Sequence, residues 1–595
     1  MKRVTAVALS FVLTCGAFAA PPQDAGKATT AKPKSAKKSA TSSVAKDLQD
    51  MKQALEAQQQ QIQQLRQDVQ TRDGRIQQLE QKVDQNQAAA SQAQAKADSA
   101  ASQAAQQDQT VSALKTDVTD LKSNATNVAL SLQEEQKKVG EAIESPLALH
   151  FKGITITPGG FLAAETVWRQ RALAADINSS FNSVPFPGAT QSQMSEFFGS
   201  GRQSRVSMLA EGKLKDVKIG GYFEADFLSS GTTSNNNQSN SYTMRQRQVW
   251  GQAAFQSGWT VTGGQMWSLI TETRKGTDIR SEALPLTIDP QYTVGFSWAR
   301  QYGLRVTKNF SNKAWVGISV EDPQTTLTAH GNAANTVVGS AGNSGGTYNA
   351  FNGNYAFNKA PDLVAKLAVE PGWGHFEIFG VASQFRARIF PNATAATPSA
   401  AGAFNDSKTG GGFGVNMRGS LANKHVDVGI HLLGGNGIGR YGTGGLSEAT
   451  VHDDGTLALI RSYQGLGTIE WHSPHLDLYA NYGLEYAART AFLNSAGKGV
   501  GYGSPLFANT GCSTETLPSA ANGFSPGALG SCTGDTRNLQ EGTVGFWYKF
   551  YNGSKGRVQF GPQYSYVVRN TWTGVGGNPK GTENMFFTSL RYYLP

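Results

Sequence analysis

The hydrophobic positions of this 595-residue chain follow two different periods. Through residue 144, apolar residues recur about every 3.5 positions, which is the spacing of coiled-coil helices. From Ser145 onward they alternate with polar residues, and Gly-rich and Ser-rich segments separate the alternating runs, as in strands joined by turns. The pattern predicts a helical rod over 46–144 and a β-structure over 145–595.

The first period is a heptad that continues without a break. With position a placed at Leu48, every seventh residue as far as Val139 is apolar. Nine of the fourteen d positions, from Met51 to Ala142, are apolar as well. A register kept over so many heptads favours a periplasmic coiled coil between chains, because a single amphipathic helix does not require it. The mixed residues at a and d leave dimer and trimer open.

The second period predicts long antiparallel strands. Residues 424–433, 476–486 and 558–568 alternate clearly, and several runs reach ten residues, enough for a tilted strand to cross a bilayer. Short links such as Lys215-Asp216 alternate with long polar stretches such as Pro323 to Asn354, the pattern of short periplasmic turns and long outer loops. We count about sixteen strands and predict an all-β transmembrane barrel with an aqueous channel.

Composition agrees with this division of the chain. Of the 67 glycines, 63 follow Ser145, and aromatic residues collect near the ends of the predicted strands, as at Trp547 and Tyr593. The mean hydropathy is −0.36. No run of about 18 apolar residues occurs, so the sequence predicts no membrane-spanning helix.

The N-terminal residues have the pattern of a secretory signal. A basic start precedes an apolar stretch, and Ala17-Phe18-Ala19 forms a small-residue cleavage motif, so 1–19 is predicted to be a signal peptide. Lipidation at Cys15 is the alternative. The Lys/Ala-rich segment 20–45 cannot bury a core and is predicted to be a disordered linker.

Export also suggests a state for the two remaining cysteines. Cys512 and Cys532 form an even pair within a Gly- and Ser-rich stretch. In an oxidising compartment such a pair is expected to form a disulfide. A metal site would need more ligands than lie nearby in the sequence.

The barrel segment carries an excess of positive charge, with 35 Lys and Arg against 28 Asp and Glu after Ser145. Because an arginine that faces lipid in mid-strand costs about 2–4 kcal/mol, most strand arginines are expected to face the lumen. The residues predicted to line the pore are Arg205, Arg245, Arg247, Arg300 and Arg418, and the other strand arginines are Arg202, Arg305, Arg386, Arg388 and Arg461.

An arginine-rich lumen favours anions, and a guanidinium group can hold a carboxylate through two parallel hydrogen bonds. The alternative is that these arginines only pair with acidic residues across the barrel wall. The acidic residues available for such pairs are Glu211, Glu224, Asp226, Glu377 and Glu485.

One segment, 269–292 between the fifth and sixth predicted strands, differs from the other loops. It is rich in charge and contains Pro285 and Pro290, which stiffen it. We interpret it as a constriction loop that folds into the lumen, and an ordinary outer loop is the alternative. Its candidate functional residues are Glu272, Arg274, Asp278 and Arg280.

These features together resemble the DcaP-like trimeric outer-membrane porins. The motifs that carry the resemblance are Gly159-Gly160-Phe161, Ser204-Arg205, Glu224-Ala225-Asp226-Phe227, Arg245-Gln246-Arg247 and Gly264-Gln265-Met266-Trp267-Ser268. The resemblance implies a sixteen-stranded barrel, a homotrimer in outer-membrane lipid, and uptake of small anions, dicarboxylates in particular. It also supports a constriction after strand five. Two features depart from the family pattern, a longer coiled coil and a terminal Pro595 after Tyr593.

Two other functions compete with that of a porin. No catalytic motif occurs and the histidines are scattered, so no enzyme and no cofactor are expected. The stronger rival is a structural anchor, in which the coiled coil and the Lys-rich linker tether the outer membrane to peptidoglycan. A pure anchor would need far fewer strands, which favours the porin. No nucleic-acid partner is expected.

Overall fold

The structure is a computed structural model that describes residues 148–228, 243–331, 336–341, 354–393, 397–515 and 531–595. Ahead of these ranges it describes only Val118, Leu121, Lys122 and Ser131, which are helical. The predicted signal peptide, the linker and the rest of the predicted coiled coil lie outside the described residues. The chain divides into two compact units, Met1–Ala129 and Leu130–Pro595, and the second contains the fold described below.

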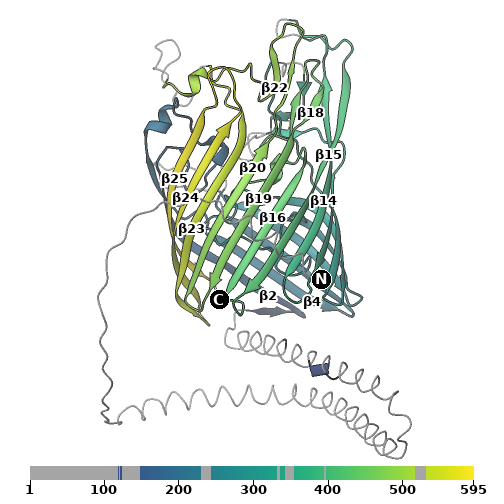
Figure 1. Cartoon of the computed structure of the whole chain (residues 1–595). Coiled ribbons are helices and arrows are strands. Elements are labelled where there is room, and N and C mark those ends of the chain that lie inside the picture. Colours follow the sequence, from purple (N-terminus) through teal and green to yellow (C-terminus); the bar gives the residue numbers. More distant parts are fainter. Residues whose placement is uncertain are drawn as a thin grey trace, which may run out of the picture. The chain divides into compact units, whose positions relative to one another are not determined.

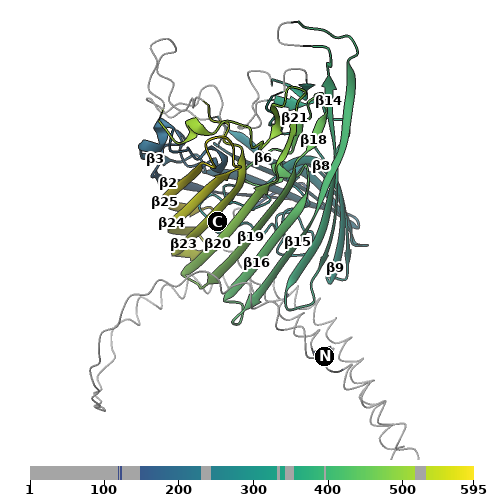
Figure 2. The ribbon, with the colours of Figure 1, turned by 45° about the horizontal axis from the view of Figure 1, so that its top comes forward.

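Sixteen antiparallel strands form a closed barrel, as the sequence predicted (Figures 1 and 2). Residues Phe161–Arg169 of the first strand pair with Met585–Tyr593 of the last, which closes the sheet. In order around the wall, the strands are β2 (Ile154–Arg169), β4 (Arg205–Leu214), β5 (Val217–Asp226), β6 (Arg245–Phe255), β7 (Trp259–Trp267), β8 (Arg300–Phe310), β9 (Ala314–Glu321), β13 (Asp362–Val369), β14 (His375–Ile389), β15 (Phe404–Leu421), β16 (Val426–Asn436), β19 (Arg461–His472), β20 (Leu476–Ala487), β23 (Thr536–Gly553), β24 (Gly556–Thr571) and β25 (Lys580–Tyr593).

Short turns join the strands at one end of the barrel and long loops join them at the other, as predicted. Turns such as 215–216, 256–258 and 473–475 define what we call the short-turn end. The loops used below are L1 (170–204), L3 (268–299), L6 (437–460) and L7 (488–535).

Short strands and 3-10 helices decorate the ends of the barrel. Three of these strands join the barrel sheet, namely β1 (Leu149–Phe151), β3 (Glu196–Ser200) and β10 (Thr336–Val337). The others form two-stranded sheets in the long loops: β11 (Gly339–Ala341) with β12 (Asn354–Ala356), β17 (Ala449–Val451) with β18 (Leu457–Leu459), and β21 (Thr490–Leu493) with β22 (Gly499–Tyr502). The 3-10 helices are η1 (Phe181–Ser183), η2 (Thr190–Gln193), η4 (Gly439–Tyr441) and η5 (Thr510–Cys512).

The two faces of the wall differ in chemistry because side chains alternate along each strand. In β9, Ile318 is 53% exposed on the outer face and the next residue, Ser319, is 2% exposed on the inner face. The same alternation of outward apolar and inward polar residues continues along β13, β20 and β24. An apolar outer face of this kind is the surface of a barrel that spans a bilayer.

Among the residues that the structure describes, no helix is both long and apolar enough to cross a membrane.

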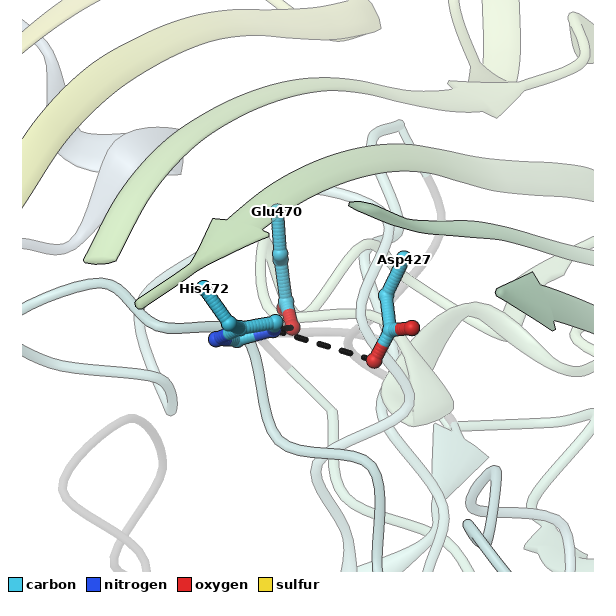
Figure 3. Close-up of side chains that lie close together, drawn as sticks. All are labelled: Asp427, Glu470 and His472. Atoms are coloured by element: carbon cyan, nitrogen blue, oxygen red, sulfur yellow. Dashed lines mark ion pairs between the residues drawn. The ribbon is translucent and has the colours of Figure 1, made fainter. Parts of the chain in front are cut away.

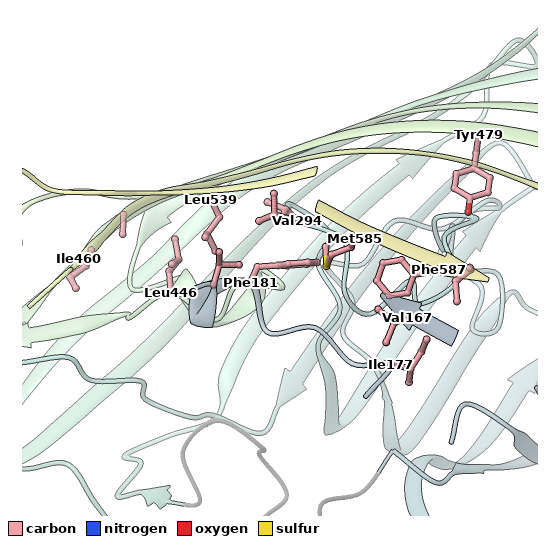
Figure 4. Packing of buried hydrophobic residues seen from close by; sticks show 14 of the residues in the cluster. Val167, Ile177, Phe181, Val294, Leu446, Ile460, Tyr479, Leu539, Met585 and Phe587 are labelled. Atoms are coloured by element: carbon pink, nitrogen blue, oxygen red, sulfur yellow. The ribbon is translucent and has the colours of Figure 1, made fainter. Parts of the chain in front are cut away.

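Loops fill much of the space inside the wall. Figure 4 shows one apolar cluster in which Val294 of L3 and Leu446 of L6 lie near wall residues such as Leu539 and Met585. Phe181, which belongs to L1, is fully buried in the same cluster. The channel that the sequence predicted is therefore narrowed by packed loops.

Candidate functional site

L3 leaves the wall at the end of β7 and rejoins it at the start of β8, so it occupies 268–299. The predicted segment 269–292 ends seven residues too early, and the sixth strand begins at Arg300 rather than near Thr293. The reason is that 293–299 alternates between polar and apolar residues like a strand. In this segment the N–H groups of Val294 and Gly295 donate to Glu541 and Glu485 of the wall, and the pairing of β8 with β7 begins only at Arg300.

The first part of L3 forms a hairpin over 272–283. Thr273 and Glu282 pair as an antiparallel bridge. The Arg274 N–H donates to the Ser281 carbonyl at 2.6 Å, and the Ala283 N–H donates to the Glu272 carbonyl at 2.8 Å. We call this element the L3 hairpin.

The L3 hairpin is attached to the wall formed by β13 to β15. The Arg418 Nε donates to the Glu272 Oε1 at 2.8 Å. The Thr273 N–H and hydroxyl both donate to the Glu377 Oε1, at 3.1 and 2.6 Å. On β5, the Arg280 guanidinium lies 4.9 Å from the centre of the Tyr222 ring. The hairpin therefore contacts well-separated strands of the barrel from inside.

The second part of L3 is held by polar side chains of the opposite wall. The N–H groups of Ile288, Val294 and Gly295 donate to Gln563, Glu541 and Glu485, at distances of 2.7, 2.8 and 2.9 Å. A loop inside a barrel needs partners for its backbone N–H groups, because an unpaired buried N–H is costly. The inward-facing acids and amides provide those partners.

Replacing Gly295 by alanine should push L3 away from β19. Gly295 has a φ of +81°, and a Cβ there would lie 2.0 Å from the Gly465 carbonyl oxygen. We expect a lower unfolding temperature and a larger single-channel conductance. Gly445→Ala is the matched control, since Gly445 has a φ of +55° but open space around a Cβ. An equal effect of both substitutions would show that backbone strain, and not contact with the wall, is responsible.

Four of the five predicted pore-lining arginines gather on the inner wall of β4, β6 and β8. Arg247 bonds to Glu224 and Asp226, both at 2.6 Å, and Arg245 bonds to Asp226 at 2.9 and 3.0 Å. The Arg205 Nη1 lies 3.6 Å from the Glu224 Oε2. We call Arg205, Arg245, Arg247 and Arg300 the arginine cluster.

Arg300 gives this cluster its excess of positive charge. Among the described residues it forms no ion pair; its Nη2 donates to the Gln291 Oε1 at 3.0 Å, and its guanidinium lies 4.9 Å from the centre of the Trp267 ring. Four guanidinium groups thus share Glu224 and Asp226. Burial raises the pKa of the neighbouring Asp289 carboxyl in L3.

The remaining predicted site residues lie elsewhere. Arg418 is 7% exposed and is engaged by Glu272, so it anchors L3 and is separate from the arginine cluster. Arg274 reaches Asp427 and Glu470 near the short-turn end, at 3.6 and 3.4 Å. Asp278 and Arg280 are exposed on the L3 hairpin.

Three strand arginines, Arg386, Arg388 and Arg461, do not face the lumen. In β14, Ala387 and Ile389 are buried on the inner face, which places the two neighbouring arginines on the outer face. Arg461 is exposed at the start of β19. All three lie at the long-loop ends of strands, and β14 with 15 residues is longer than the roughly 9–11 that a bilayer requires.

No family model matches the chain, and no curated protein matches it. Among solved structures, the outer-membrane channel DcaP of Acinetobacter baumannii superposes with a TM-score of 0.50 and 14% sequence identity, over 75% of this chain and 99% of that one. The barrel has the DcaP fold.

The DcaP likeness confirms, at the level of the fold, the resemblance that the sequence motifs suggested. Two further structures are more distant. OmpT, an outer membrane protein of Vibrio cholerae, matches with a TM-score of 0.39 and 11% identity, over 75% of this chain and 99% of that one. An anion-selective porin from Comamonas acidovorans matches with a TM-score of 0.38 and 9% identity, over 74% of this chain and all of that one.

Other buried charges inside this DcaP-like barrel were not predicted as site residues. Lys366 and Glu377 pair at 2.9 Å with side chains that are 0% exposed, and Arg591 pairs with Glu165 at 2.7 Å. Lys366 shares its face with the apolar Val364, so the alternation gave no sign of its inward position. Such pairs can be found by matching acidic with basic residues on neighbouring strands, but only once the strand register is known.

The structure joins Cys512 and Cys532 in a disulfide within L7, across a separation of 20 positions. The Gly188 N–H of L1 donates to the Cys512 carbonyl at 2.8 Å, so the bridge also supports the contact between two loops.

Replacing both cysteines by serine should lower the free energy of unfolding by about 3 kcal/mol, because the open loop gains entropy in the unfolded chain. Ion selectivity should stay the same, since the arginine cluster belongs to other strands. Thermal unfolding with and without reductant would measure the loss. Reductant should not affect the double-serine variant; a further drop there would show that the reductant acts on something other than the disulfide.

Proposed function

We propose that this chain forms an outer-membrane porin for small hydrophilic solutes with a preference for anions. The arginine cluster carries the proposal, because four guanidinium groups share two carboxylates on the inner wall. A surplus of fixed positive charge in a narrow lumen raises the local concentration of anions. The apolar outer face and the DcaP fold support a place in the outer membrane.

Small dicarboxylates are the proposed solutes within this class. Arg205 and Arg245 have side chains that are 21% and 25% exposed, so their guanidinium groups are partly open to solutes. Guanidinium groups can take a carboxylate in bidentate fashion, and a dicarboxylate can engage two of them together. The same resemblance leads us to propose a homotrimer, with 1–19 removed on export and 46–144 in the periplasm.

Single-channel recording tests the proposal directly. The purified protein is placed in a planar bilayer under a salt gradient, and succinate is then added, with acetate as the monovalent control. Three equal conductance steps, an anion-selective reversal potential and stronger block by succinate are expected. Cation selectivity would contradict the anion proposal while keeping the pore.

A structural anchor is the second candidate, favoured by the long heptad at 46–144 and the Lys-rich linker ahead of it. In that function the helices bind peptidoglycan and the barrel only holds the membrane. Deleting 23–144 separates the two functions, because a pore keeps its conductance while an anchor loses envelope integrity. A complete absence of conductance in the intact protein would put the anchor first.

A further inference from the structure

A group of side chains suited to a metal ion lies at the short-turn end of the lumen, on strands that do not contribute to the arginine cluster. Asp427 follows the first residue of β16, and Glu470 and His472 lie at the end of β19 (Figure 3). Each side chain offers one ligand atom, and these three atoms all lie within 4.8 Å of one another.

Strand register explains why these residues meet. Asp427 and Glu470 are direct cross-strand partners, and His472 follows Glu470 by two positions on the same face. His472 is also the direct partner of Asp477 on β20. In Figure 3 the Glu470 carboxylate and the His472 ring lie close together, with Asp427 facing them.

The His472 ring is oriented as a metal ligand would be. Its Nδ1 lies 3.2 Å from the Asp477 Oδ1, while its Nε2 lies 3.4 Å from the Glu470 Oε2 and 3.7 Å from the Asp427 Oδ2. A histidine whose Nδ1–H is held by a carboxylate presents the lone pair of Nε2 to a metal, which is the usual outer support of such ligands. The Lys549 Nζ holds Asp477 in turn, at 2.7 Å.

In the structure, Arg274 of the L3 hairpin is the cation that contacts both Asp427 and Glu470, and these contacts are long. Its Nη1 and Nη2 lie 3.6 and 3.4 Å from Asp427 and Glu470, beyond the roughly 2.7–2.9 Å of a tight charged hydrogen bond. The Glu470 side chain is 0% exposed, and its Oε1 has no hydrogen-bond partner among the described residues. A buried carboxylate oxygen without a partner is costly, and a metal ion bound to this carboxylate would offset part of that cost.

With the His472 ring neutral, as a metal ligand must be, the charges around the site leave one acid uncompensated. Four carboxylates face three cations; the carboxylates are Asp427, Glu470, Asp477 and Glu272, and the cations are Arg274, Arg418 and Lys549. The His425 ring also lies nearby, with its Nδ1 3.1 Å from the His472 carbonyl. Exchanging the single charge of Arg274 for a divalent ion would bring this group to neutrality.

We propose that Asp427, Glu470 and His472 bind a divalent transition metal of the Zn²⁺ class, in competition with Arg274. One imidazole nitrogen and two carboxylates make a three-ligand set that leaves a fourth position for water. Ca²⁺ and Mg²⁺ prefer oxygen ligands in greater number, so the histidine selects against them. When the metal binds, Arg274 leaves the two carboxylates, and the L3 hairpin loses its contact with β16 and β19.

Calorimetric titration of the purified full-length protein with Zn²⁺ tests the site. We expect one site per chain, and at least about tenfold weaker binding in His472→Ala and in Glu470→Gln, because each removes a ligand. His475→Ala is the matched control, since His475 lies in the adjacent turn and its ring has the Lys549 carbonyl as its hydrogen-bond partner, at 3.5 Å. Equal affinity in His472→Ala and the intact protein would overturn the site, as would an equal loss in His475→Ala.

Arg274→Gln tests the competition without altering the wall. It removes the competing cation from an exposed loop position, so Zn²⁺ affinity should rise by about fivefold, the equivalent of a partly exposed ion pair. An unchanged or weaker affinity would overturn the competition. This variant also keeps the proposal testable if the wall variants fail to fold.

Discussion

Exchanging Arg205 and Arg300 together for glutamate should convert an anion-preferring pore into a cation-preferring one. The arginine cluster has four guanidinium groups and two carboxylates, and the double exchange leaves two guanidinium groups among four carboxylates. A unit charge at about 4 Å contributes about 1 kcal/mol even in bulk water. We therefore expect the anion-to-cation permeability ratio to fall by at least about tenfold.

The reversal potential under a potassium chloride gradient measures this change. Arg386→Glu with Arg388→Glu is the matched control, because it makes the same change in charge on the outer face of β14. A reversal potential that stays the same in the Arg205 and Arg300 variant would show that the cluster does not set selectivity. An equal shift in the control would point to total charge and not to the lumen.

Lysine at the same two positions separates charge from geometry. Lysine keeps the positive charge but lacks the planar fork of the guanidinium group. Anion selectivity should therefore remain, while block by succinate should weaken.

Removing the tip of the L3 hairpin should enlarge the pore. The deletion takes out 274–281 and joins Thr273 to Glu282 through two glycines, which suits two residues that already pair as a bridge. Single-channel conductance should rise by about twofold or more, because a constriction dominates the resistance of a pore. The unfolding temperature should change little, since Arg418 still bonds to Glu272 and Glu377 still bonds to Thr273.

A deletion of 494–498 serves as the control for loop shortening. These residues form the exposed turn between β21 and β22 in L7, where the Asn494 N–H donates to the Lys498 carbonyl. The single-channel conductance of this control variant should match that of the intact protein. If the L3 deletion also leaves the conductance the same, the narrowest part of the pore lies at another level.

The strands were predictable because an outer face toward lipid and an inner face toward a polar lumen impose alternation, and a one-residue slip would turn every outward apolar side chain into the lumen. The cost of placing an arginine in lipid gave the inward direction of Arg205, Arg245 and Arg247. Alternation misplaced the end of L3, because 293–299 alternates without pairing with β7, and its Val294 packs into the apolar cluster inside the lumen. Alternation shows on which face of the sheet a side chain lies, but it does not show which residue that side chain contacts.

The partners of the site residues depend on register and on distant parts of the chain. Arg205 faces Asp226 across β4 and β5, and Asp226 faces Arg245 across β5 and β6, so the cluster follows once these pairings are known. Glu272 and Arg418 are 146 positions apart, and no local pattern connects them. Sequence could thus suggest both residues but not their pairing.

The wall holds the second part of L3 through its main chain. Gln563, Glu541 and Glu485 accept hydrogen bonds from N–H groups that every residue except proline possesses. Side chains of L3 that lie outside the apolar cluster can therefore diverge while the loop keeps its path, provided that Gly295 is kept. A lineage that carries these three acceptors can acquire new solute preferences by changing loop residues alone, with no need to rebuild the barrel.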